Sequence, residues 1–71
     1  MTLSEFYQVV DECAKVNRWR IGQALFNGLT IERPELAEKL RATACDPFYS
    51  NTKRDKRYLK AVAIINAEWN K

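Results

Sequence analysis

Histidine is absent from this 71-residue chain, and glycine, proline and cysteine occur only twice each. Without histidine, the chain lacks the usual general base near neutral pH and the usual activator of serine or cysteine nucleophiles. Gly22 and Gly28 lie six residues apart inside a helical pattern, so they do not form a glycine-rich phosphate loop. We therefore expect no enzyme activity, no catalytic residues and no cofactor.

The two cysteines exclude further kinds of chemistry. Cys13 and Cys45 are far apart, form no Cys-x-x-Cys pair and have no histidine nearby to complete a metal site. We expect no metal site and two unpaired thiols, as is usual in a reducing compartment.

Long apolar runs are missing as well. No segment approaches the roughly 18 consecutive apolar residues that a membrane-spanning helix needs. Residues 1–10 lack the basic and apolar regions of a signal peptide. The composition, with 46% hydrophobic and 30% charged residues, is that of an ordinary globular chain. We expect a soluble cytoplasmic protein that forms a single domain over residues 1–71 and does not bind membranes.

Apolar residues recur at the 3.6-residue spacing of an α-helix, and strand-like alternation is absent. Thr2 and Glu5 form a capping-box pattern just before the first helix, which is expected over residues 3–16. The apolar residues that recur along this helix are Phe6, Val9, Val10, Cys13 and Val16.

The second predicted helix is apolar over most of its surface, which favours a central position. Its apolar residues are Trp19, Ala24, Leu25, Phe26, Leu29 and Ile31. Large aromatic residues at helical spacing, here Trp19 and Phe26, are typical of a core. Gly22 and Gly28 weaken the helix, which leaves open whether backbones pack closely there or the helix ends at Gly28.

Two further helices complete the pattern. Pro34 suits the first position of a third helix that runs to about Thr43. The last helix is expected to be capped by Thr52 and Asp55. Their inward residues are predicted to be Leu36, Ala37 and Leu40, then Tyr58, Val62, Ile65 and Trp69. The predicted fold is a compact all-α bundle of about four helices, with a short loop at residues 45–51 before the last.

Three segments carry a resemblance to known proteins. Residues 19–27 read WRIGQALFN, residues 33–43 read RPELAEKLRAT, and residues 46–49 read DPFY. In order and spacing they resemble a group of small phage, prophage and bacterial proteins. The chain departs from that pattern at Ala42, where the group often has glycine, and the residues after Tyr49 have no counterpart. The resemblance implies a phage-associated origin and a helical fold, and no particular activity.

Some of these shared residues are polar and lie three and four positions apart, which places Arg20, Gln23 and Asn27 on one helix face. Such side chains could read base edges or hold a peptide. They could equally bind the backbone of the turn formed by residues 46–49, which is the interpretation we favour. Whether that turn is a packing lid or a ligand site stays open. The candidate second site consists of Arg20, Gln23, Asn27, Asp46, Phe48 and Tyr49.

Charge is distributed unevenly along the chain. Residues 1–17 carry three acidic and one basic residue, a net charge of −2, whereas residues 52–71 carry six basic and two acidic residues, a net charge of +4. Five cations are expected on the opening turns of the last helix, where the helix dipole disfavours positive charge. We call them the basic segment: Lys53, Arg54, Lys56, Arg57 and Lys60. A helix N-terminus flanked by cations suits an anionic partner, although such runs are also common as solvated faces.

Two functions fit these features. The first is a phage-encoded interaction protein that binds and modulates a host macromolecule in the host cytoplasm, such as a host protein with an acidic surface. The second is a small nucleic-acid-binding protein whose basic segment contacts the phosphate backbone. Binding to phosphates weakens steeply as the salt concentration rises, so the salt dependence of binding distinguishes the two functions. The sequence fixes neither the partner nor the oligomeric state, and a homodimer is compatible with it.

We predict that a reducing agent leaves the melting temperature unchanged, because Cys13 and Cys45 are expected to be free thiols. Thermal unfolding followed by circular dichroism, with and without reductant, measures this. A Cys13→Ser variant serves as the control, and a drop of many degrees in the wild type alone would reveal a stabilising disulfide.

Overall fold

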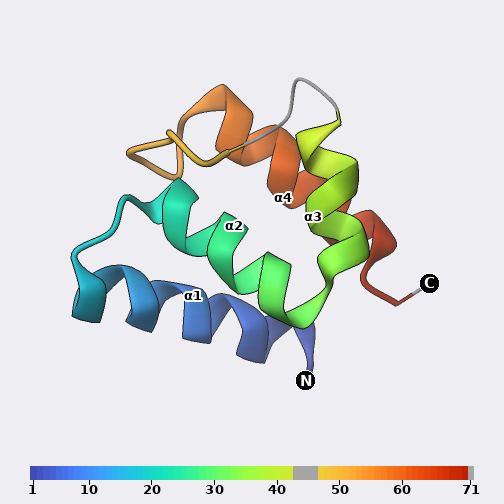
Figure 1. Ribbon diagram of the computed structural model, residues 1–71, viewed down its shortest axis with the longest axis horizontal. Coiled ribbons are helices and arrows are strands. Elements are labelled where there is room, and N and C mark those ends of the chain that lie inside the picture. The colour runs from blue at the N-terminus through green and yellow to red at the C-terminus, as the bar shows by residue number, and fades with distance from the viewer. Residues whose placement is uncertain (43–46, 71) are drawn as a thin grey trace.

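The computed structural model describes residues 1–42 and 47–70, and these residues form four α-helices without strands (Figure 1). The helices are α1 (Leu3–Asn17), α2 (Ile21–Glu32), α3 (Pro34–Arg41) and α4 (Lys56–Glu68). Figure 1 shows α2 between α1 and α3, which agrees with the central position predicted for it. The predicted all-α fold is confirmed.

α1 and α2 form an antiparallel hairpin (Figure 1). The predicted capping box is present, since Thr2 Oγ1 accepts a hydrogen bond from the Glu5 N–H and the Glu5 carboxylate accepts one from the Thr2 N–H. α1 ends at Asn17, one residue later than expected, and Arg18 then adopts the left-handed conformation with φ of 56°. Such a residue satisfies the last carbonyls of a helix and reverses the chain, here with the Arg18 N–H donating to the Ala14 carbonyl.

α2 passes through Gly28 without a break, so the helix does not end there. A Cβ atom on Gly28 would lie 3.5 Å from Phe6 and Val10, an ordinary contact with α1. A Cβ atom on Gly22 would lie only 1.8 Å from the carbonyl oxygen of Pro47. Close backbone packing therefore explains the glycine at position 22, where the segment that contains Pro47 and Ser50 contacts the helix.

Arg33 alone connects α2 to α3, and Pro34 opens α3 as predicted. α3 ends at Arg41, and the expected end at Thr43 falls outside the described residues. α4 begins at Lys56 because the Asp55 side chain caps it by accepting a hydrogen bond from the Arg57 N–H. The prediction that Lys53 and Arg54 lie on the opening turns of this helix is wrong, since both precede it.

The core draws on all four helices, and it contains the predicted inward residues of α3 and α4, with Val62 partly buried at its edge. Its buried members are Phe6, Val10, Ala24, Leu25, Phe26, Leu29, Leu36, Ala37, Leu40, Tyr58, Ala61, Ile65 and Trp69. Trp19 is only partly buried and packs against this core. Three apolar residues of the predicted pattern are exposed: Val9 at 42%, Val16 at 74% and Ile31 at 78%. The four helices leave that side of the α1–α2 hairpin uncovered at these positions.

The end of α4 is attached to the rest of the molecule by several contacts. The Trp69 ring packs on the Phe6 ring of α1, with centroids 4.9 Å apart. The Arg33 guanidinium lies 5.2 Å from the Trp69 ring and donates to the Trp69 carbonyl oxygen. Lys39 of α3 forms an ion pair with Glu68. These contacts close the bundle around Trp69.

We predict opposite effects for alanine at the two glycines. Gly22→Ala forces Pro47 and Ser50 away from α2, and we expect a loss of about 1 to 3 kcal/mol in the free energy of unfolding. Gly28→Ala adds helix propensity and a methyl group at normal contact distance, so we expect a gain of up to about 1 kcal/mol. Urea unfolding measures both variants, and equal effects would contradict the close approach at Gly22.

Candidate binding surfaces

The turn at residues 47–50 is seated on the first turn of α2. The Gly22 N–H donates to the Ser50 carbonyl over 3.0 Å, and the Ser50 N–H donates to the Pro47 carbonyl over 2.8 Å. Pro47 and Ser50 are fully buried, which is why the missing Cβ of Gly22 matters. The turn is therefore held to α2 by its backbone, while Tyr49 remains 65% exposed.

Arg20 covers this turn from outside. Its guanidinium carbon lies 5.8 Å from the Phe48 ring centroid and 5.4 Å from that of Tyr49. The Phe48 ring also meets Phe26 of α2 edge-on, with centroids 6.3 Å apart. Phe48 is thus a packing residue as well as a surface residue, and Tyr49 is the exposed aromatic group of the pair.

The three polar residues of the candidate second site are only partly brought together. Arg20 is the N-cap residue that precedes α2, whereas Gln23 and Asn27 lie within the helix, four residues apart. Arg20 contacts the aromatic rings of the turn, whereas the hydrogen bond to the turn backbone comes from Gly22. Asn27 lines a groove between α1 and α2. The expected position of Asp46 lies outside the described residues.

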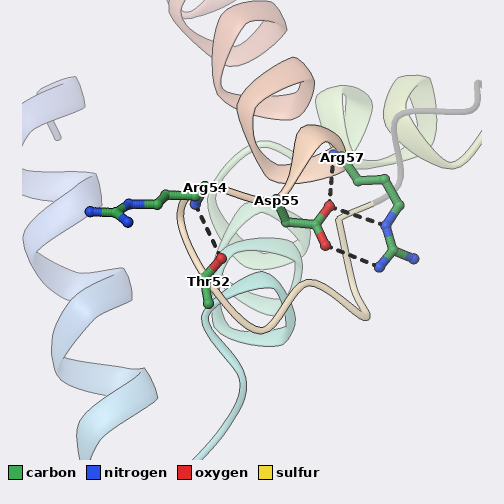
Figure 2. Close-up of polar contacts among 4 residues, drawn as sticks. All are labelled: Thr52, Arg54, Asp55 and Arg57. Carbon is green, nitrogen blue, oxygen red and sulfur yellow. Dashed lines mark hydrogen bonds and ion pairs between the residues drawn. The ribbon is translucent and has the colours of Figure 1, made fainter.

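All five side chains of the basic segment are exposed, but they do not form one compact cluster. Lys53 Nζ lies 3.0 Å from Asp11 Oδ1 of α1. Arg57 turns back onto Asp55, with Nη2 3.3 Å from Oδ2. Figure 2 shows the Arg54 and Arg57 side chains pointing in opposite directions from the turn. The segment therefore presents positive charge on two sides of the N-terminus of α4.

Asp55 organises this end of the molecule. Its Oδ1 atom accepts hydrogen bonds from the Arg57 N–H over 2.8 Å and from Arg57 Nε over 3.3 Å (Figure 2). Just before it, the Arg54 N–H donates to Thr52 Oγ1 over 3.3 Å. The hydrogen bonds from Arg57 lower the pKa of Asp55 below its ordinary value. A carboxylate at a helix N-terminus also interacts favourably with the helix dipole, whereas the cations there interact unfavourably with it.

Sequence reasoning missed an apolar groove between α1 and α2 with a volume of about 140 Å³. Its walls include the exposed Val9 and Ile31 together with the partly buried Cys13 and Trp19. The available signal was the apolar surface of α2, which extends further round the helix than one packed face requires. The full lining is Phe6, Val9, Cys13, Trp19, Ala24, Asn27, Gly28, Ile31 and Glu32.

The described residues include no group of three histidine, cysteine, aspartate or glutamate side chains that could hold a metal ion. Cys13 is a free cysteine, and Cys45 lies outside the described residues. Within the same part of the chain, no helix is long and apolar enough to cross a membrane. The groups that the structure does present are cations, exposed aromatic and aliphatic side chains, and carboxylates, which are the means of non-covalent recognition.

No protein-family model, curated protein or solved structure matches the chain. The resemblance to small phage proteins therefore stays a prediction, and the surfaces are judged by their geometry.

We predict that the capping role of Asp55 is pH-dependent. Because the folded-state pKa of Asp55 lies below its ordinary value of 3.8, its stabilising effect is present above that pH and is lost as the pH falls through the folded-state pKa. The melting temperature of Asp55→Ala should lie below that of the wild type at pH 7. The difference should shrink below about pH 4. Asp55→Asn, which caps without charge, is the control, and a difference independent of pH would contradict the assignment.

Proposed function

We propose that this protein is a small phage-encoded interaction protein without enzyme activity, which binds and modulates a host protein by docking its basic segment on an acidic surface. The observation that carries the proposal is the exposure of five cations within eight residues around the N-terminus of α4. The phage origin and the host partner rest on the sequence resemblance.

Folding does not account for this arrangement of charge. Lys56 and Arg57 occupy the first turn of α4, where the helix dipole disfavours them, and Lys53 and Arg54 add like charge immediately before it. The ion pairs that Lys53 and Arg57 make are solvent-exposed, and such pairs contribute little to stability. Stability gives no reason for placing these cations here, whereas a binding role does.

A protein partner fits the surroundings better than a nucleic acid. Lys53 lies against the exposed carboxylate of Asp11 on α1. A phosphate backbone that extended past Lys53 would meet this carboxylate, whereas a protein surface can match positive and negative groups side by side. Nucleic-acid binding is therefore the alternative that the experiment must exclude.

We predict that Arg54→Gln combined with Lys56→Gln weakens partner binding by about tenfold or more at low salt, because two cations leave the docking surface. These two positions leave the Lys53 and Arg57 contacts with Asp11 and Asp55 intact. The partner is first captured from bacterial lysate with and without nuclease, and its affinity is then measured by calorimetry over a range of salt concentrations.

The matched control is Lys15→Gln combined with Arg18→Gln, which removes the same charge from the last turn and the C-cap of α1, outside the basic segment, and should leave the affinity within about twofold. Both double variants should keep the helical spectrum of the wild type. Equal binding by the two double variants would refute the docking role of the basic segment. Capture that is lost after nuclease treatment would identify nucleic acid as the partner instead.

A further inference from the structure

The packing of α1 against α2 leaves an apolar groove open to solvent. Ala24, Gly28 and Phe6 contribute to its lining, and the two residues of α2 have little or no side chain to fill it. Ile31 is 78% exposed and Val9 is 42% exposed, so both walls present apolar surface to solvent. Contiguous exposed apolar surface of this kind is typical of an interaction site.

The groove is bordered by a continuous stripe of side chains on α1. Glu5, Val9, Glu12 and Val16 follow one another at spacings of four, three and four residues, so they are neighbours on one face of the helix. Val16 is 74% exposed, lies about two turns beyond Val9 and continues this face of α1 past the lining of the groove. This length suits an elongated partner such as a helix rather than a compact small molecule.

The charged residues of the groove lining and of this stripe are all acidic. Glu32 lines the groove on the α2 side, and Glu5 and Glu12 stand beside Val9 on the α1 side. Thr2 holds Glu5 in the capping box and lowers the pKa of Glu5, which keeps this carboxylate ionised. Two copies of the chain placed groove to groove would bring these carboxylates together, which disfavours a second copy as the occupant.

We propose that the groove binds a basic amphipathic helix of a partner protein. A bulky apolar side chain of that helix would enter between Val9 and Ile31, and its lysine or arginine residues would meet Glu12 and Glu32. This surface is distinct from the basic segment. Asp11, which pairs with Lys53, is two residues from Val9 and thus lies about 200° round α1.

The probe is a synthetic helical peptide of about 18 residues, long enough to span the groove, with leucine at i, i+4, i+7 and i+11 and lysine and alanine elsewhere. Trp19 lines the groove and reports binding by fluorescence in a Trp69→Phe background. We expect saturable binding, and we expect Ile31→Ser to weaken it by about tenfold or more. Glu12→Gln combined with Glu32→Gln should weaken binding and reduce its dependence on salt.

The matched control is Leu59→Ser, because Leu59 is a 54% exposed apolar residue on α4 and lies outside the groove. It should bind the peptide as the wild type does. The proposal is overturned by an absence of saturable binding up to about 1 mM peptide, by equal weakening in both serine variants, or by equal binding of a peptide with the same composition and a scrambled leucine stripe. Sedimentation of the protein alone as a dimer that Ile31→Ser dissociates would assign the groove to a second copy, and would equally overturn it.

Discussion

The position of the basic segment depends on the contact between two backbones, that of α2 at Gly22 and that of the turn at Pro47 and Ser50. The hydrogen bond from Gly22 to Ser50 attaches the turn, and the Pro47 carbonyl occupies the space where any other residue would carry a side chain. Asp55 follows Ser50 closely and starts α4. The attachment of this turn to α2 therefore determines where α4 begins, and with it the direction in which the cations point. One glycine positions a surface that it does not touch.

The parts of the fold that sequence reasoning predicted well are those specified by neighbouring residues. The capping box of Thr2 and Glu5 and the proline at the start of α3 are local signals, and both helices begin where these signals place them. The start of α4 was misplaced because Thr52 and Asp55 are both good capping residues. The choice between them is a tertiary matter, since the turn that precedes them is attached to α2.

The candidate surfaces also combine features that the local sequence specifies with features that depend on tertiary contacts. Composition alone identified the cations, but the pairing of Lys53 with Asp11 joins two distant parts of the chain and no local pattern encodes it. Periodicity correctly marked Val9 and Ile31 as apolar positions of helices. It could not show that they flank an open groove, because that depends on which side of the α1–α2 hairpin the other helices cover.

The contacts of Trp69 constrain the order in which the protein can fold during synthesis. Phe6 emerges from the ribosome early, yet the ring on which it packs is added only after residues 7–68 have been translated. The same residue supplies the carbonyl oxygen to which the Arg33 side chain donates, so this hydrogen bond also forms only after Trp69 has been added. The α1–α2 hairpin and α3 can pack beforehand, but the side of Phe6 that faces Trp69 stays uncovered until α4 is complete. During synthesis, Phe6 therefore lacks the ring that covers it until Trp69 has been added.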